Sequence, residues 1–302
     1  MKQKKLSIFE KRQGKLGYLF LMPWLIGFLI FTALPFVYTI YLSFHGVSLT
    51  IEGWQITFVG LDNYNVTFLR NPDFVPGLIS FITMELTYAP VIVVISFILA
   101  LLLNRNIKFR AGFRALFFLP VIVMSGPVMY QLMDAGSMGS VGIRQMALYN
   151  MVYQFSPFVA RQLEDLFNNY SFVLWFTGIP IVLFISGLQK IDTSVLEAAR
   201  IDSATSWQIL WKITLPIIRP IILVASILTI VQLGVYSLNP VMPLIQSVIY
   251  NTTNGLGLAS AFAWVYSFVV LAIIGIAFWL LKGPSERVVM EQKRLIKQGG
   301  RL

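Results

Sequence analysis

The chain alternates between long apolar segments without charge and shorter segments that carry its charged side chains. No Asp, Glu, Lys or Arg occurs from residue 16 to 51, and none occurs from 221 to 281. The second stretch is too long for one membrane-crossing helix, which needs about 20 residues, and the polar segment 237–257 divides it. The pattern predicts six spans, at 17–44, 78–103, 115–133, 167–188, 217–236 and 258–281.

Composition supports a membrane protein. Hydrophobic residues make up 57% of the 302 residues, charged residues only 12%, and the mean hydropathy is +0.76. A soluble domain carries about 25% charged residues. We therefore expect an all-α, polytopic fold in a single transmembrane domain, 1–302, with tails at 1–16 and 282–302. The basic start resembles a secretory signal, but the apolar run after it is too long, so we interpret it as a retained first span.

The net charge of +10 has a topological explanation. In the six-span arrangement, all but three of the 23 basic residues fall on the side of the two termini, the exceptions being Arg70, Arg144 and Arg161. Basic residues collect on the cytoplasmic side of membrane proteins. The distribution predicts that both termini are cytoplasmic, and it gives no reason to expect a nucleic-acid partner.

Few residues suit catalysis. The chain has no cysteine and a single histidine, His45, in an outer segment. We therefore predict neither a catalytic residue nor a metal site. No G-x-x-x-x-G-K-[ST] sequence occurs, so this chain has no P-loop for ATP. Of the outer segments, 45–77 is expected to be a loop, and 134–166 is expected to form short amphipathic helices at the membrane surface or over a cavity.

A polar, helix-forming stretch, EAARIDSATSWQILWKITLP, separates the fourth and fifth spans at 197–216. Ser194 and Glu197 fit a capping box for a helix that ends near Asp202. Ser203 or Thr205 is expected to cap a second short helix that ends before Pro216. One interpretation is that Glu197 only caps its helix and the loop only joins two spans.

The same stretch resembles the EAA motif of bacterial ABC importer permeases. The matching positions are Glu197, Ala198, Ala199, Asp202, Ile213, Leu215 and Pro216. Ser203 replaces the glycine that usually follows the aspartate, and because Ser is small and caps helices well we expect the turn to survive. The resemblance implies that the loop 189–216, called the coupling loop below, docks on a separate ATPase.

Other stretches resemble the maltose-type carbohydrate permeases within that group. They are LPFVYTIYLSF at 34–44, FVGLDNY at 58–64, LNRNIKFRAGFRALFFLP at 103–120 and GLGLASAFAW at 255–264. Together they extend over essentially the whole chain. One departure is SLNPVMPLIQ at 237–246, where family members often carry a glycine-rich segment, so the outer gate near it is expected to differ.

The resemblance implies a type I importer permease that brings a sugar or oligosaccharide into a bacterial cell. Its partners would be a second homologous permease, in a heterodimer, two ATPase subunits that bind ATP and Mg, and an extracytoplasmic solute-binding protein. ATP binding would draw the two coupling loops together and open the cavity outward. An ion-coupled secondary transporter is the alternative, although the sequence lacks a clear inverted repeat or a series of intramembrane charges.

Polar side chains at membrane depth are candidates for the translocation path, because they usually face the interior of a helix bundle. The candidates are Glu85, Tyr88, Tyr130, Gln131, Gln232, Tyr236 and Asn239. Glu85 is the single acidic residue inside a predicted span. It either pairs with a structural partner, lines the path or lies near the outer surface. The tyrosines are equally compatible with an aromatic belt at the membrane interface.

Overall fold

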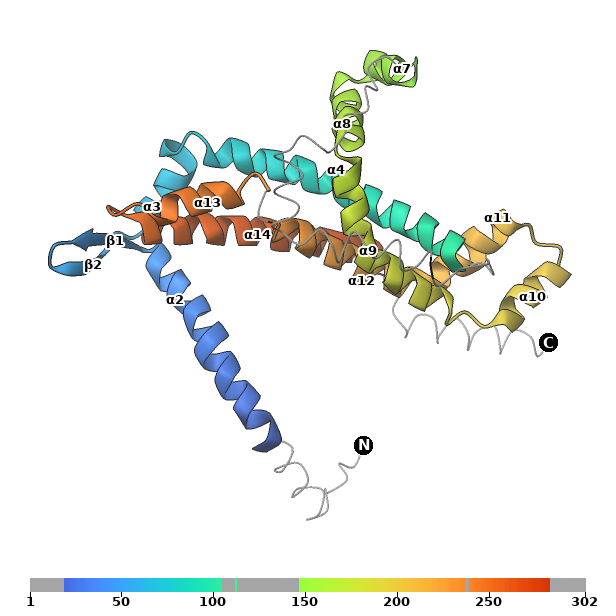
Figure 1. Cartoon of the computed structure of the whole chain (residues 1–302), viewed down its shortest axis with the longest axis horizontal. Coiled ribbons are helices and arrows are strands. Elements are labelled where there is room, and N and C mark those ends of the chain that lie inside the picture. Colours follow the sequence, from blue (N-terminus) through green and yellow to red (C-terminus); the bar gives the residue numbers. More distant parts are fainter. Residues whose placement is uncertain (1–18, 105–111, 113–146, 237–238, 283–302) are drawn as a thin grey trace, which may run out of the picture. The chain divides into compact units, whose positions relative to one another are not determined.

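The computed structural model describes residues 19–104, 112, 147–236 and 239–282, and within these ranges the chain is predominantly helical (Figure 1). By length and composition four described segments are able to cross a membrane: Leu19–Ser43, Phe74–Asn104, Ser206–Gly234 and Gly255–Leu281. The helix pair Pro157–Asn168 and Phe172–Leu188, bent by 80°, would make a fifth span. The expected span 115–133 lies outside the described residues.

The spans begin and end close to their predicted limits, with one exception. Helix α4, Phe74–Asn104, helix α9, Tyr170–Leu188, and helix α14, Gly255–Leu281, each end within one residue of the predicted position. The exception is the predicted span 217–236, because its helical segment begins at Ser206. A second short helix was expected to end before Pro216. A short helix does begin after Thr205, but the helical segment continues through Pro216 instead of ending there.

Wide helical turns allow two spans to continue through a proline. The π-helical turn η1, Leu29–Ala33, precedes Pro35 in helix α2, Leu34–Ser43. The π-helical turn η4, Leu210–Thr214, precedes Pro216 in helix α12, Leu215–Gly234. In each case the N–H just before the proline donates to the carbonyl five residues back. A proline has no N–H and its ring crowds the preceding turn, so a wide turn before it accommodates the ring without ending the helix.

The chain divides into two compact units, Met1–Ile79 with Pro240–Phe268 and Ser80–Asn239 with Val269–Leu302. The first unit contains a β-hairpin where the sequence was expected to form only a loop. Strands β1, His45–Thr50, and β2, Gly53–Phe58, pair antiparallel, with His45 opposite Phe58 and Thr50 opposite Gly53. Gly53 has a φ of 113°, a backbone conformation that glycine adopts readily and other residues do not.

The hairpin and the helices of the first unit meet at two buried or half-buried asparagines. Asn63, in helix α3 (Asp62–Asn65), donates to the carbonyl oxygens of Ser43 and His45 at 2.9 and 3.0 Å. Asn254 donates to Asn63 Oδ1 at 2.8 Å and accepts from the Val47 N–H at 3.1 Å. These four hydrogen bonds are called the asparagine cluster below. Two of them connect Asn63 to the end of the first span and the start of the hairpin, and two connect Asn254 to residues 191 and 207 positions away.

The first unit also contains the π-helical turn η2, Val66–Arg70, and helix α13, Met242–Ile249. Arg70 Nη1 lies 3.6 Å from Asp62 Oδ1, and the two side chains form an exposed ion pair in the segment that follows the hairpin. The described residues bury none of the most apolar window of the span Leu19–Ser43.

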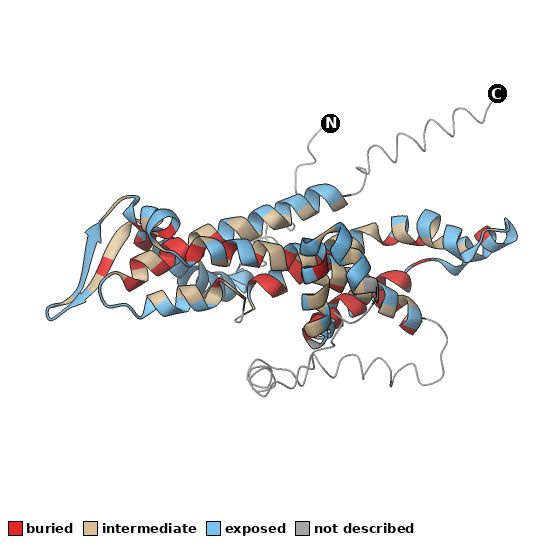
Figure 2. Ribbon diagram, turned by 90° about the horizontal axis from the view of Figure 1, so that it is seen from above, coloured by how far each residue is buried: buried red, intermediate tan, exposed pale blue. Residues whose placement is uncertain are grey.

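The second unit has two clusters of buried apolar residues between its helices, and buried residues are red in Figure 2. One cluster joins α4, α9 and α12 around the aromatic rings of Tyr88, Phe172 and Phe176. The other joins the same helices around Phe184 and Ile218 and includes Ile191, just before the coupling loop turns into a helix. At Gly187 an added Cβ would lie 2.9 Å from Ile221, so α9 and α12 pack closely at this point.

The described part of 134–166 forms the short helices that the sequence predicted. Helix α7 extends over Ala147–Phe155 and helix α8 over Pro157–Asn168. Ser156 caps α8 by accepting a hydrogen bond from the Val159 N–H, and Pro157 follows at the first helical position, where its missing N–H costs nothing.

Candidate functional site

The coupling loop forms helix α10, Thr193–Ile201, and its N-cap is Asp192. Asp192 Oδ1 accepts a hydrogen bond from the Ser194 N–H at 3.0 Å, and this bond lowers the pKa of the Asp192 carboxyl. Ser194 was predicted to be the cap, which is wrong. Asp and Ser cap helices equally well, and the backbone leaves the extended conformation at Asp192, two residues earlier than expected.

This correction changes the role of Glu197. With the cap at Asp192, Glu197 is the fifth helical residue and lies beyond the third position from which a capping box reaches back. Its side chain is exposed, and none of the described residues forms a hydrogen bond or ion pair with its carboxylate. The carboxylate has no structural partner within the described chain, and it is available to another molecule.

Helix α10 ends in a Schellman motif. Ser203 has a φ of 58° and is the one described non-glycine residue with a positive φ. Its N–H donates to Arg200 O, and the Ala204 N–H donates to Ala199 O, both at 3.0 Å. These are the two bonds that close a helix on a left-handed residue. The turn therefore forms with serine in the usual place of glycine, as predicted, although serine is less favourable in this conformation.

A second helix begins directly after this turn. Helix α11, Ser206–Ile209, has Thr205 as its N-cap, one of the two predicted candidates. Thr205 and Gln208 form a capping box, in which the Thr205 N–H donates to Gln208 Oε1 at 2.8 Å and the Gln208 N–H donates to Thr205 Oγ1 at 3.3 Å. From α11 the chain continues through η4 into α12 as one helical segment.

One face of the coupling loop is fixed to the second unit. Ala199 is buried, and Leu196 and Leu215 pack against the apolar cluster around Phe184. Helix α9 leads into the loop, and beyond the turn at Ser203 helix α11 continues into α12 as one helical segment.

The opposite face of the coupling loop is exposed. Glu197, Ala198, Asp202, Ser203 and Pro216 are all exposed. Between them lie apolar side chains that sequence analysis did not select, with Ile201 83% and Trp207 67% exposed. Trp207 and Trp211 stack edge to face, with ring centroids 5.4 Å apart. Sequence analysis could have found these side chains, because they are large apolar residues in an otherwise polar loop. They suit a protein partner, because burying them releases water from apolar surface.

The candidate path residues do not form one site. Tyr88 donates to Asp165 Oδ2 at 2.7 Å, and its ring lies at 88° to that of Phe172. The ring of Tyr236 contacts the same Phe172 edge to face, with ring centroids 5.2 Å apart. Both tyrosines thus belong to one aromatic cluster. Asn239 donates to Gly234 O at the end of α12.

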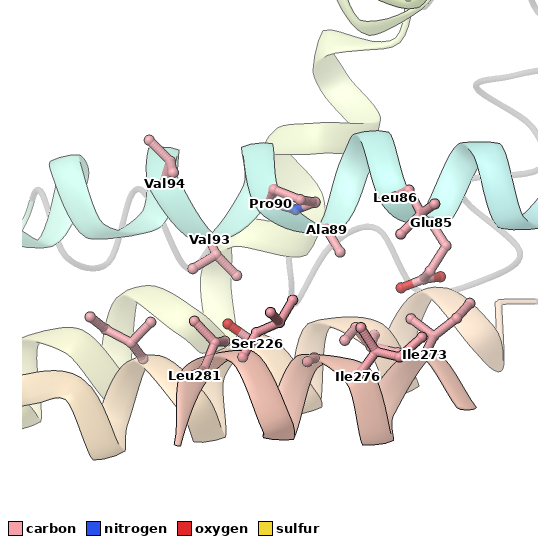
Figure 3. Close-up of a pocket in the computed structure, with 14 residues that line it drawn as sticks. Glu85, Leu86, Ala89, Pro90, Val93, Val94, Ser226, Ile273, Ile276 and Leu281 are labelled. Carbon is pink, nitrogen blue, oxygen red and sulfur yellow. The ribbon is translucent and has the colours of Figure 1, made fainter. Parts of the chain in front are cut away.

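Glu85 and Gln232 differ from these residues because they have buried side-chain oxygens without a hydrogen-bond donor among the described residues. Glu85 is fully buried, and neither of its carboxylate oxygens has a hydrogen-bond donor among the described residues. The same holds for Gln232 Oε1. Glu85 lines a cavity of about 400 Å³ bounded by α4, α12 and α14 (Figure 3). Tyr130 and Gln131 lie outside the described residues. No group of three or more potential metal ligands is present in the described ranges.

Comparison with known proteins adds to this geometry. A family model described as "binding-protein-dependent transport system inner membrane component" matches residues 143–288. The chain is 30% identical over 301 residues to the probable ABC transporter permease protein YesP of Bacillus subtilis, covering 94% of both chains. It is 31% identical over 229 residues to the arabinooligosaccharides transport system permease protein AraP of the same organism, covering 72% of this chain and 67% of that protein.

Among solved structures, the chain is similar to one in a bacterial alginate ABC transporter, crystallised in complex with an alginate pentasaccharide-bound periplasmic protein. The TM-score is 0.62 at 19% identity, and the match covers 88% of this chain and 93% of the other. At this identity the likeness establishes the fold.

Proposed function

The chain belongs to the family of binding-protein-dependent transport system inner membrane components, and we propose that it carries a sugar or oligosaccharide through the bacterial cell membrane. It is a multi-pass membrane protein and a permease subunit of an ABC transporter, not itself an enzyme. The names of its relatives support the substrate class, since AraP is named for arabinooligosaccharides and the structural neighbour for alginate.

The proposed topology has six spans with both termini in the cytoplasm. Four described spans and the bent pair α8–α9 support five of these spans. The remaining one is predicted from the sequence at 115–133. In this arrangement Lys190, Arg200 and Lys212 of the coupling loop lie on the cytoplasmic side, as expected from the distribution of basic residues.

The proposed mechanism is coupling to a separate ATPase through the coupling loop. The observation that supports it best is an exposed helix, capped at both ends, whose Glu197 has no structural partner in the described chain. Rigid ends and a free functional face are what a mechanical contact between subunits requires. Glu197 and Asp202 would meet basic groups of the ATPase, and Ile201 and Trp207 would meet its apolar surface.

The complete transporter would contain a second homologous permease, two ATPase subunits and an extracytoplasmic solute-binding protein. ATP and Mg would be bound by the ATPase subunits, because this sequence has no P-loop. Closure of the ATPase pair would move α10, and through it α9 and α12, from an inward-facing to an outward-facing arrangement.

Glu197→Lys tests this mechanism, with Glu52→Lys as its control. Both positions are exposed acids in loops between spans. We expect Glu197→Lys to reduce sugar uptake by vesicles at least tenfold and to remove the ATPase from the purified assembly, while insertion and thermal stability stay unchanged. Glu52→Lys should keep ATPase association. Normal uptake by Glu197→Lys would contradict the mechanism, and uptake that follows an ion gradient without ATP would establish the ion-coupled alternative instead.

A further inference from the structure

Glu85 lies in the wall of the cavity bounded by α4, α12 and α14. Figure 3 shows its carboxylate projecting from α4 toward α14. The side chain is 0% exposed, and no donor among the described residues reaches either oxygen atom. Buried carboxylates are normally paired, because burial without a partner is costly. The described residues therefore leave the carboxylate of Glu85 without a hydrogen-bond donor, and Glu85 lines a cavity of about 400 Å³.

The other walls of this cavity do not suit a sugar. Apart from Glu85 and Ser226, the lining is apolar, and it includes Val93, Ile230, Ile273 and Ile276. A sugar has hydroxyl groups on every side and needs polar partners on several walls. A single carboxylate in an apolar cavity instead matches an apolar ligand that carries one hydrogen-bonding group.

The small residues in the lining favour a helix as that ligand. Each wall contributes a small residue to the lining, Ala89 from α4, Ser226 from α12 and Ala277 from α14. Small residues permit the close approach of helix backbones in a membrane, and polar side chains join such helices by hydrogen bonds. Ionisable residues within membranes commonly pair with one another.

We propose that a transmembrane helix of the second permease subunit enters this cavity and that a basic side chain on it pairs with Glu85. This inference rests on the proposed function, which supplies the second permease. Charge complementarity identifies the chemistry of the partner residue. Two unoccupied carboxylate oxygens are matched best by the paired N–H groups of an arginine, which bind both oxygens at once. A lysine would satisfy them less completely.

A photo-crosslinking experiment tests the contact without altering Glu85. The photoreactive residue p-benzoylphenylalanine replaces Val94, which lines the cavity and is 55% exposed. Val182 on α9, which is outside the lining, receives the same residue as the control. The tagged chain is purified with its partners from host membranes after illumination, and the crosslinked peptides are sequenced. We expect the Val94 probe to label a membrane-spanning peptide of the second permease that contains an Arg or Lys.

A charge-reversal pair then tests the role of the carboxylate. Glu85→Arg should lower the amount of co-purifying second permease at least tenfold, since two basic side chains would face each other. Glu85→Gln should lower it less. Replacing the identified basic residue by Glu should restore assembly with Glu85→Arg, which a defect in folding alone would not permit.

The outcomes separate this inference from the proposed function. Crosslinks from Val94 to lipid, to the transported sugar or to this chain itself would overturn the inference, and so would full assembly by Glu85→Arg. If these results appear while the ATPase still co-purifies, the importer function stands and only the pairing fails. If neither ATPase nor second permease co-purifies with the unmodified chain, the proposed function fails first.

Discussion

The coupling loop and the asparagine cluster are both held by hydrogen bonds, but the bonds connect different parts of the chain. In the coupling loop the capping bonds join residues two to five positions apart, such as Thr205 and Gln208. In the asparagine cluster Asn254 binds residues 191 and 207 positions away. The capping bonds of the loop depend on neighbouring residues in the sequence, whereas the cluster forms only when distant segments have folded together.

This difference has consequences for stability and for function. A local cap contributes to one helix and can be lost without unfolding its neighbours. A buried asparagine that joins three segments leaves several unpaired groups when it is removed. Mutations in the cluster should therefore change the stability of the whole first unit, and mutations in the caps should change the order of the coupling loop alone.

The largest effect is expected for Asn63→Leu. The substitution leaves the Ser43 and His45 carbonyl oxygens and the Asn254 amide without their partner, at a cost of about 4 kcal/mol in the free energy of unfolding. Chemical unfolding in detergent micelles measures it. Asn65→Leu is the matched control, because Asn65 is in the same short helix but exposed. Equal stability of the two variants would refute the importance of the cluster.

Gly257→Ala should have the next largest effect. A Cβ at this position would overlap the carbonyl oxygen of His45, which itself accepts from Asn63. Overpacking of this kind costs about 2 kcal/mol. Gly275→Ala in the same helix adds a methyl group where no atom lies within 4 Å. Thermal unfolding of both variants measures the effect. The Tm of Gly275→Ala should equal or exceed that of the wild type, and an equal decrease of Tm in both variants would refute the steric argument.

Thr205→Ala should act on the coupling loop alone. Loss of the N-cap costs about 1 kcal/mol of local helix stability, because the Gln208 N–H loses its acceptor. Hydrogen exchange at α11 should accelerate about fivefold, while exchange in the first unit stays unchanged. Thr205→Ser keeps the hydroxyl group and serves as the control. Faster exchange throughout the protein would show that the cap is not local.

Ser203→Gly should give the smallest change, and in the stabilising direction. Ser203 has a left-handed backbone conformation, which costs a residue with a Cβ about 1 kcal/mol relative to glycine. Hydrogen exchange at the end of α10 should slow in Ser203→Gly and remain unchanged in Ser203→Ala. Faster exchange in the glycine variant would mean that the greater backbone entropy of glycine in the unfolded loop outweighs the relief of backbone strain at this position.

The local parts of the site were predictable from sequence. The motif identified the coupling loop, Thr205 was among the expected caps, and the turn at Ser203 was expected to survive. The cap at Asp192 was missed because two good capping residues lie two positions apart, and only the backbone decides between them. The uninterrupted helix through Pro216 was missed because a proline usually marks a helix end, and a wide turn before it has no known sequence signal.

The non-local parts were not predictable. Nothing in the sequence near Asn63 or Asn254 indicates that they bind each other. The lone acid at Glu85 was noticed, but the sequence predicted neither the cavity that it lines nor the lack of a hydrogen-bond donor among the described residues. Nor did the sequence show that Tyr88 and Tyr236 share one aromatic cluster, because their contact through Phe172 depends on the packing of three helices.

The wide turn at Leu210–Thr214 has a further consequence for the direction of the coupling loop. It holds one residue more than a regular turn, and each residue of a helix corresponds to a rotation of about 100°. Deleting one residue there would rotate Trp207 and the rest of the loop before the turn by roughly that angle about the axis of α12. The number of residues in this turn thus sets the direction in which the exposed face of the coupling loop points relative to α12.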